Sequence, residues 1–283
     1  MSARRIDLHT HSTASDGTDT PEQLAREVGR SGLDVFALTD HDTTDGWTAA
    51  AASLPQGVSL IGGAEISCSI DGISLHLLGY LFDPADPILA SRLHELRASR
   101  VGRAERMVAL LAAAGHPVSW GQVRALAAGT VGRPHIAQAL VDVGAVRELA
   151  DAFSPDWIGS HGRYWAGRLE LGAVEAVRLV VAAGGVAVCA HPGARARGAT
   201  IGSAAIEELA EAGLAGLEVD HVDHGPAERA TLRELAARLG LFVTGSSDYH
   251  GDLKPVRLGA HLTAPEVYDE IVARATGTAV VAA

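Results

Sequence analysis

Short apolar runs rich in β-branched residues recur along the chain, and the segments between them carry apolar residues at helical spacing. The runs lie at residues 5–8, 35–38, 185–188, 216–219 and 241–244. Strands that alternate with helices are typical of a mainly parallel sheet. The pattern therefore predicts an α/β fold.

Local signals mark the ends of the first helix. Thr20, Pro21 and Gln23 supply a cap residue, a first-turn proline and a capping-box partner. Gly32 is placed to end the same helix. We expect a helix between these positions.

The region after residue 63 has a different pattern, because two strand-like runs, 64–70 and 73–82, flank Asp71-Gly72. This dipeptide is favoured in two-residue hairpin turns. The region should be a β-hairpin in which Ile70 faces Ile73.

The hairpin register makes a prediction about chemistry. Counting outward from the turn, Ser67 faces His76, and Glu65 lies one diagonal step from His76 on the same face. Diagonal neighbours lie roughly 7 to 8 Å apart at the backbone, so this carboxylate and imidazole could share a metal ion. The alternative is a solvated Glu65 and a serine-paired His76. The apolar neighbours of both residues favour the metal, since a buried charge needs a partner.

Residues 86–150 contain many apolar residues at the three- to four-residue spacing of a helix, and Leu89, Leu93 and Leu96 are the first example. We interpret residues 1–85 and 171–283 as one α/β domain and residues 86–170 as a helical insertion that forms part of the substrate site. The arginines at positions 97, 100, 103 and 106 are expected to form mostly a solvated helix face, with one or two reaching a phosphate.

Charge narrows the classes of partner. The net charge of −11 argues against general binding of duplex DNA, which needs a cationic surface. Residues 85–170, however, hold ten arginines against eight acidic residues, so a local anion site is possible there. Within this segment, Trp157, Tyr164 and Trp165 could close over the site or stack on a base, although at least one tryptophan should pack in the core.

Nothing in the sequence indicates a membrane or an oxidising compartment. The N-terminal residues lack the apolar stretch of a secretory signal, and the longest apolar run, Leu179–Ala190, is too short to span a bilayer. Cys68 and Cys189 form no Cys-x-x-Cys pair, so we expect reduced core thiols in a cytoplasmic protein without a membrane partner.

Histidines and carboxylates collect where the predicted strands end. His9 and His11 are two residues apart, so on a strand both imidazoles share one face, and Asp16 follows at short range. His41 follows the second predicted strand. Strand ends are where catalytic groups gather in parallel α/β folds.

The same theme recurs in the second half of the chain. His191, His221, Asp248 and His250 each follow a predicted strand. Any one of them alone would more often be a structural residue, but together they indicate a metal site. Imidazole and carboxylate ligands without thiolate suit manganese, zinc or iron, and the number of ligands implies more than one ion.

The order of these motifs resembles that of the PHP family, the polymerase and histidinol phosphatase superfamily, over nearly the whole chain. The resemblance implies a distorted seven-stranded (β/α) barrel, similar to a TIM barrel, with three divalent ions. Manganese is the first choice, with zinc or iron as alternatives. The matching motifs are Asp7-Leu8-His9-Thr10-His11-Ser12 with Ser15-Asp16-Gly17, Leu38-Thr39-Asp40-His41-Asp42, Glu65 with His76, Ala190-His191-Pro192-Gly193, and Ser247-Asp248-Tyr249-His250-Gly251.

The resemblance also implies a set of ligands for each ion. His9, His11, Glu65 and Asp248 would surround the first ion, with Glu65 bridging to a second. His76 and His191 would hold the second ion, and Asp16, His41 and His250 the third.

Gly132-Arg133-Pro134-His135 in the insertion resembles a bacterial group of this family that acts on nucleotides. Its members remove the 3′-phosphate of 3′,5′-bisphosphate nucleotides or trim short RNA from its 5′ end. A nucleotide or short single-stranded RNA is then the expected substrate, with Arg133, His135 and His221 binding it. Relatives often read Tyr-His-Pro-Asp-His around the position of His221. Here the tyrosine and proline are absent, which puts the substrate fit at that position in question.

The mechanistic hypothesis is that a hydroxide held between two ions attacks phosphorus, with Glu65 and Asp248 as catalytic metal ligands. Arg133 would neutralise charge on the phosphoryl oxygens. His221 would position the phosphate or protonate the leaving oxygen. Three alternatives stay open: a phosphatase of another small metabolite such as histidinol phosphate, a C–N amidohydrolase, and a non-catalytic metal-binding module.

Overall fold

Seven strands form the path of the main sheet in the computed structural model, which describes residues 3–127, 129–195 and 198–283. They are, in order, β1 (Ile6–Thr10), β2 (Val35–Leu38), β3 (Ser59–Ile70), β4 (Ile73–Tyr80), β6 (Val186–Ala190), β7 (Gly216–Asp220) and β8 (Phe242–Gly245). Two short strands, β5 (Leu171–Gly172) and β9 (Val281–Ala282), pair with β3. The backbone of Thr10 bridges that of Tyr249 just beyond β8, so the sheet nearly closes into a barrel.

One strand breaks the regularity of this barrel. β4 runs antiparallel to both of its neighbours, β3 and β6, whereas the other pairs on the path are parallel. The predicted fold, a distorted seven-stranded α/β barrel, is thereby confirmed.

The predicted hairpin is present with the predicted register. Ile70 pairs with Ile73 and Ser67 with His76 across β3 and β4. Asp71 has a φ of 52° and Gly72 a φ of 76°, the left-handed pair that a tight hairpin turn of this kind requires.

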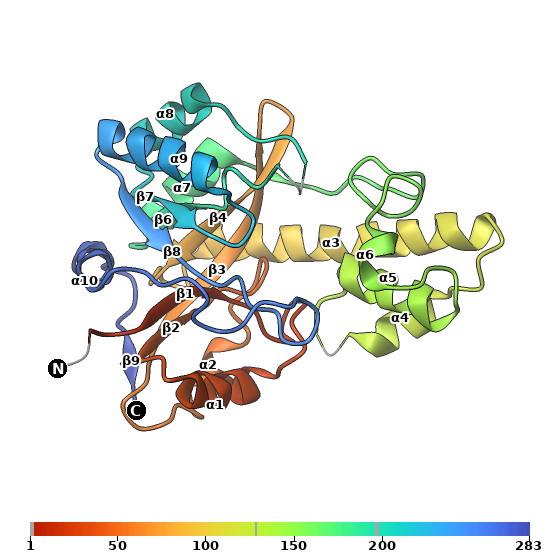
Figure 1. Cartoon of the computed structure of the whole chain (residues 1–283), viewed down its shortest axis with the longest axis horizontal. Helices are drawn as coiled ribbons and strands as arrows, with labels where there is room; N and C mark the ends of the chain where they lie inside the picture. The colour runs from red at the N-terminus through yellow and green to blue at the C-terminus, as the bar shows by residue number, and fades with distance from the viewer. Residues whose placement is uncertain (1–2, 128, 196–197) are drawn as a thin grey trace.

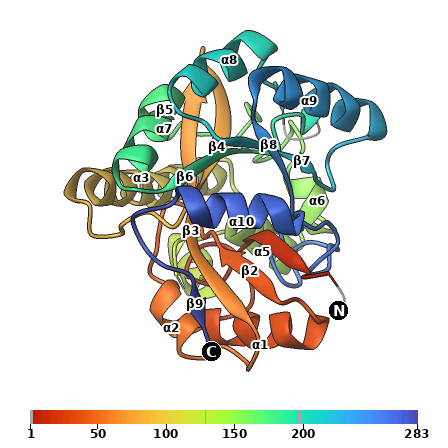
Figure 2. The ribbon, with the colours of Figure 1, turned by 90° about the vertical axis from the view of Figure 1, so that its left-hand side faces the viewer.

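Helices cover the outside of the barrel (Figures 1 and 2). Figure 2 shows α1 and α2 on one side, α7, α8 and α9 on the other, and α10 across the end of the barrel near both termini. Their bounds are α1 (Pro21–Ser31), α2 (Trp47–Ala51), α7 (Ala173–Ala182), α8 (Ser203–Glu211), α9 (Pro226–Leu239) and α10 (Pro265–Arg274). The predicted capping box of α1 is present: Gln23 N donates to Thr20 Oγ1 at 3.2 Å, and Gly32 ends the helix with a φ of 73°.

The segment between β4 and β5 is helical and lies at the end of the barrel opposite α10 (Figure 1). It contains α3 (Pro87–Ala113), α4 (Trp120–Leu126), α5 (Arg133–Asp142) and α6 (Leu149–Ala152). Helix α3 belongs to two cores. Leu89, Leu93 and Leu96 pack with the barrel, whereas Met107 and Leu111 pack in a separate core built within residues 104–166.

Two arginines of α3 are buried, whereas the sequence suggested that they form part of a solvated helix face. Arg100 and Arg103 are only 9% and 8% exposed. Arg100 NH2 lies 3.1 Å from Asp42 Oδ2, and Arg103 Nε donates to the carbonyl of Ala166 at 2.8 Å. The expectation was wrong for these two residues because each has a partner distant in sequence that compensates for its burial.

Two further expectations concern the thiols and the membrane. Cys68 and Cys189 are buried and free, as predicted. Among the described residues, no helix has the length and apolarity needed to cross a bilayer.

Candidate metal centre

The predicted ligands come from several strands but meet at one end of the barrel. His9 lies on β1 and His11 just beyond it, while Glu65 and His76 lie on β3 and β4. His41, His191, Asp248 and His250 follow β2, β6 and β8, and Asp16 lies in the loop after β1. The carboxyl ends of the parallel strands share one rim, and the β3–β4 hairpin brings Glu65 and His76 to it, where the backbone of Glu65 bridges that of His41 beyond the end of β2.

Four donor atoms form the first cluster. His9 Nε2 lies 3.1 Å from His11 Nε2. Glu65 Oε2 lies 3.4 Å from His9 Nε2 and 3.2 Å from His11 Nε2. Asp248 Oδ1 lies 3.4 and 3.3 Å from the same two nitrogens.

These separations fit a metal ion. Donors roughly 2.1 Å from a shared ion stand about 3.0 to 3.4 Å apart in octahedral or tetrahedral geometry. A carboxylate and imidazole set of this kind suits zinc, manganese or iron. The first predicted ligand set therefore has the right spacing to hold an ion.

The other oxygen of Glu65 faces a second group. Glu65 Oε1 lies 2.6 Å from His76 Nδ1 and 3.0 Å from His191 Nε2. Glu65 itself is 1% exposed. Its two oxygens thus address two separate sets of imidazoles, which is the arrangement a bridging carboxylate needs.

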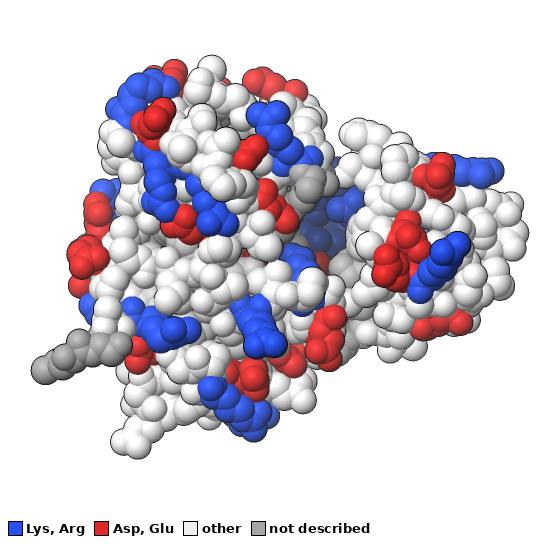
Figure 3. Space-filling view, in the orientation of Figure 1, with Lys and Arg blue, Asp and Glu red and all other residues white. Residues whose placement is uncertain are grey.

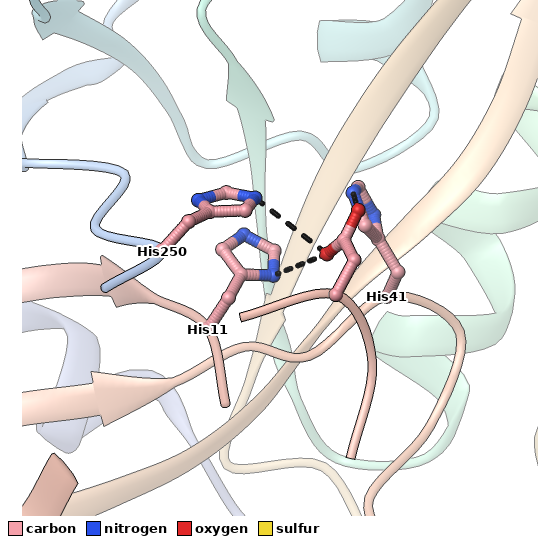
Figure 4. A group of neighbouring side chains, drawn as sticks. His11, His41 and His250 are labelled. Atoms are coloured by element: carbon pink, nitrogen blue, oxygen red, sulfur yellow. Dashed lines mark ion pairs between the residues drawn. The ribbon is translucent and has the colours of Figure 1, made fainter. Parts of the chain in front are cut away.

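A third group surrounds Asp16, and Figure 4 shows the rings of His11, His41 and His250 gathered around one carboxylate. Asp16 Oδ1 lies 3.6 Å from His250 Nε2 and 3.8 Å from His11 Nδ1, and Asp16 Oδ2 lies 3.7 Å from His41 Nε2. The structure adds two contacts to the predicted grouping. His11 faces both this group and the first, and His41 Nδ1 also lies 3.0 Å from Glu65 Oε2.

Several ring nitrogens in this region are buried without a hydrogen bond from any described residue. They are His41 Nδ1, His76 Nδ1 and His221 Nε2. Buried polar atoms are almost always satisfied in folded proteins. His41 Nδ1 and His76 Nδ1 both face Glu65, so a metal ion there would satisfy them.

Nearby charges raise the pKa values of two histidines in the cluster, His9 and His11. Burial disfavours the charged form of His9, but Glu218, Glu65 and Asp248 outweigh it and raise the pKa of His9 well above its ordinary value. Against the same burial, Asp248 and Glu65 raise the pKa of His11 to about 9. In the metal-free protein a cation would have to compete with protons at these two rings.

Two other histidines, His41 and His250, are held neutral. Burial, reinforced by Arg100, lowers the pKa of His41 well below its usual value. Burial and His11 do the same for the pKa of His250. Burial would raise the pKa of Glu65, yet the histidines around it hold that pKa well below its usual range. The cluster thus combines ionised carboxylates with imidazoles ready to bind a cation.

The sequence reasoning missed a carboxylate that orients this cluster. Glu218 on β7 is fully buried; its Oε1 lies 3.0 Å from His9 Nδ1, and its Oε2 accepts from the backbone N–H of His191 at 2.9 Å. Carboxylates behind a ligating histidine fix its tautomer and orientation. A lone acidic residue within the apolar run 216–219 was the available signal, since a buried carboxylate needs partners.

A second missed residue is Arg168, at the end of the insertion. Its NH2 lies 3.3 Å from His76 Nε2, and its side chain is only 9% exposed. Burial and Arg100 lower the pKa of Arg168. The insertion thus delivers a buried guanidinium to the edge of the ligand cluster.

His221 lies beside the first cluster. The backbone N–H of Asp223 donates to His221 Nδ1 at 3.0 Å, so the proton of a neutral ring sits on Nε2, which is 3.4 Å from Asp248 Oδ2. His221 is fully buried. Any contact with a phosphate would therefore take place within the ligand cluster rather than at its rim.

The motif Gly132-Arg133-Pro134-His135 lies close to the metal end of the barrel, where two glycines allow chain segments to approach each other. A Cβ at Gly132 would stand 3.6 Å from Asp16 Oδ2, and one at Gly129 would stand 2.2 Å from the carbonyl of Thr13. Arg133 and His135 lie in the first turn of α5, and His135 Nδ1 accepts from Gly132 N at 3.0 Å. Arg133 Cζ lies 5.6 Å from the centre of the Phe153 ring. The glycines before Arg133 thus approach the loop that carries Asp16, while the Arg133 guanidinium lies over Phe153.

A barrel that gathers imidazoles and carboxylates at one rim, at spacings suited to divalent cations, defines a metal-dependent hydrolase. Comparisons with known proteins make the class more specific. Residues 7–115 match the PHP domain. A 3′,5′-nucleoside bisphosphate phosphatase of Chromobacterium violaceum is 36% identical over 256 residues, 87% of each chain.

Other relatives have different names at similar identity. A 5′-3′ exoribonuclease of Haemophilus influenzae is 32% identical over 92% of this chain and 94% of its own. A phosphoribosyl 1,2-cyclic phosphate 1,2-diphosphodiesterase of Eggerthella lenta is 36% identical over 87% of this chain and 94% of its own. The crystal structure of a candidate metal-dependent phosphoesterase from Bifidobacterium adolescentis superposes with a TM-score of 0.91 at 36% identity, covering 97% of this chain and 98% of that one.

The chain belongs to the PHP family. The predicted class, a metal-dependent phosphoesterase, is confirmed at this level.

Proposed function

We propose that the protein hydrolyses a phosphate ester of a nucleotide, such as a 3′,5′-bisphosphate nucleotide, or of short single-stranded RNA. The observation that carries this proposal is the meeting of two features: a ligand cluster at the barrel rim and buried arginines of the insertion beside it. The relatives named as a nucleoside bisphosphate phosphatase and an exoribonuclease support it.

We propose three divalent ions, manganese first, held by the sets described above. Bound there, the ions would activate water and stabilise charge on the phosphoryl oxygens. Glu65 would orient the cluster through both of its carboxylate oxygens, and Asp248 would do so through Oδ1. His221 Nε2 lies 3.4 Å from Asp248 Oδ2, and His221 would position the phosphate or protonate the leaving oxygen.

The insertion, which we assign to residues 86–170, would supply the phosphate site. Burial, together with the neighbouring charges of Arg133, Arg168 and Arg100, lowers the pKa of Arg103 to about 9. Crowded guanidinium groups of this kind favour an anion among them, and their fork geometry suits phosphate. Figure 3 shows basic side chains in the hollow between the barrel and the insertion.

The aromatic residues of the insertion divide into two roles. Tyr164 and Trp157 pack with His116 in the core of the insertion, and the Tyr164 hydroxyl lies 2.9 Å from His116 Nε2. Trp165 instead lies beside Arg103, whose Cζ is 5.9 Å from the ring centre. We therefore assign Trp165, rather than Trp157, to stacking against a base.

The test is phosphate release by the manganese-loaded protein. The substrates are adenosine 3′,5′-bisphosphate, AMP, histidinol phosphate, a 5′-phosphorylated RNA oligomer and a ribose 1,2-cyclic phosphate. Each assay has a chelator control. Cleavage of the RNA is also followed as liberated mononucleotides, and opening of the cyclic ester is followed as loss of that substrate. Chelator-sensitive turnover of the bisphosphate or the RNA supports the proposal. Turnover of only histidinol phosphate or the cyclic ester refutes the nucleotide substrate, and inactivity on all five turns the choice to the amidohydrolase or non-catalytic alternatives.

Two variants separate chemistry from substrate binding. Asp248→Asn should abolish turnover while the circular dichroism spectrum stays that of the parent. Arg133→Met should raise KM for the bisphosphate, with Arg124→Met on the neighbouring helix α4 as the control. Equal KM values for the two arginine variants would remove Arg133 from the phosphate site.

A further inference from the structure

The chain contains a single lysine, Lys254, against 22 arginines. It lies in the loop between β8 and α10, six residues after Asp248. Its Nζ is 2.7 Å from Asp248 Oδ2. The Lys254 side chain is 30% exposed, whereas that of Asp248 is 1% exposed. A lysine thus reaches a buried carboxylate of the metal cluster from the solvent side.

Asp248 divides its two oxygens between different partners. Oδ1 faces the first cluster, 3.4 Å from His9 Nε2 and 3.3 Å from His11 Nε2. Oδ2 faces Lys254 at 2.7 Å and His221 Nε2 at 3.4 Å. Asp248 has a φ of 54°, which is rare for a residue with a side chain and is found where surrounding contacts hold the backbone.

The position of the ammonium is unexpected for a residue that only stabilises the cluster. A fixed positive charge on a ligand carboxylate opposes the binding of cations, so it costs metal affinity. The ammonium, however, contacts Oδ2, which is the only oxygen through which Asp248 could make a second bond to an ion held at Oδ1. Carboxylates bind metals through one oxygen or through two, and catalytic metal sites keep a position open.

We propose that Lys254 is a positioning residue that occupies Oδ2 of Asp248, so that Asp248 offers the cluster one oxygen and leaves a metal coordination position open for the substrate phosphate. This role rests on the proposed function, because it assigns a purpose to a metal site that hydrolyses phosphate esters. The side chain of Lys254 itself acts through Asp248.

The test uses Lys254→Met, which removes the charge, and Lys254→Ala as a second neutral variant should the methionine variant fold poorly. Lys254→Arg keeps a donor and a charge. Arg257→Met is the matched control, because Arg257 is an exposed cation of the same loop. Each protein is loaded with cobalt in place of its native ion, and its visible absorption and metal affinity are measured without substrate.

The expected result has three parts. The neutral Lys254 variants bind cobalt at least as tightly as the parent. Their visible bands are weaker, because a second bond from Asp248 raises the coordination number, and added inorganic phosphate changes those bands less than in the parent. Their kcat falls by about tenfold or more, the effect typical of residues that orient a metal ligand. Lys254→Arg and Arg257→Met resemble the parent.

Two results would overturn the role. A neutral variant whose cobalt bands and phosphate response equal those of the parent shows that Lys254 does not set the coordination of Asp248. Loss of bound cobalt in the neutral variants shows that Lys254 supports metal binding instead of restricting it. The spectra need no substrate, so these outcomes are separate from a failure of the proposed phosphoesterase reaction.

Discussion

Replacing Arg100 with methionine should destabilise the protein by about 3 kcal/mol. Arg100 Nε and NH2 lie 3.2 and 3.1 Å from Asp42 Oδ2, and the two side chains are 10% and 1% exposed. Removing one partner of a buried ion pair costs roughly 3 to 5 kcal/mol, because the other charge is left uncompensated. Ser67 still donates its backbone N–H and hydroxyl to Asp42, at 2.7 and 2.8 Å, so the lower end of that range applies.

The assay is urea denaturation with a chelator present, which removes any contribution of bound metal to the free energy of unfolding. Arg92→Met is the matched control. It lies on the same helix and contacts Glu95 and Glu175, but its side chain is 43% exposed. Exposed pairs contribute about 0 to 1 kcal/mol. The double variant Arg100→Met with Asp42→Asn should recover part of the loss, because the buried carboxylate is then neutral.

The single variant Arg100→Met should also lose bound metal, because Asp42 directly follows His41 and Arg100 anchors Asp42 to the insertion. Metal content after loading and gel filtration measures this. If Arg100→Met and Arg92→Met have the same unfolding free energy and the same metal content, the interpretation of Arg100 as an anchor is wrong.

Three further predictions concern pH, the insertion and a helix cap. The pKa of His11, about 9, exceeds its ordinary value of 6.5, so the stability gained from its proton is present below pH 6.5 and lost as pH rises toward 9. Manganese must displace that proton, so the difference in Tm between manganese-loaded and chelated protein should grow from pH 6.5 to 9; a constant difference would contradict this. Gly129→Ala should lower kcat/KM and cost about 1 to 3 kcal/mol, because the new Cβ would stand 2.2 Å from the carbonyl of Thr13, and parent-like kinetics would show that this close approach is not needed. Thr20→Ala should cost about 1 kcal/mol in urea denaturation without changing kcat, since it removes only the cap of α1.

Much of the architecture was predictable because its signals are local. The capping box at Thr20, the turn at Asp71-Gly72 and the strand runs depend on residues close in sequence. The hairpin register follows from the turn alone, and it places Glu65 close to His76. Predictions of this kind succeed because turn geometry fixes which residues face each other.

The rest depends on contacts between residues distant in sequence. Arg100 has the spacing of a solvated helix residue, and only its contact with Asp42, 58 positions away, explains why it is buried. In the sequence Glu218 is a single polar residue in a strand, and only its contact with His9, 209 positions away, gives it a role in the cluster. The assignment of ligands to individual ions stays a prediction, because His11 and His41 each face two groups.

The separate core of the insertion has a consequence for how such a protein can change over time. Residues 104–166 pack mainly on each other, while every predicted metal ligand belongs to the barrel. Mutations that reshape the insertion side of the hollow can then accumulate without moving the ligands, apart from the contacts made by Arg100, Gly129, Gly132 and Arg168. Under the proposed assignment of the insertion to substrate binding, reaction chemistry and substrate choice would be encoded in different segments of one chain, and a new phosphate ester could be adopted without rebuilding the metal centre.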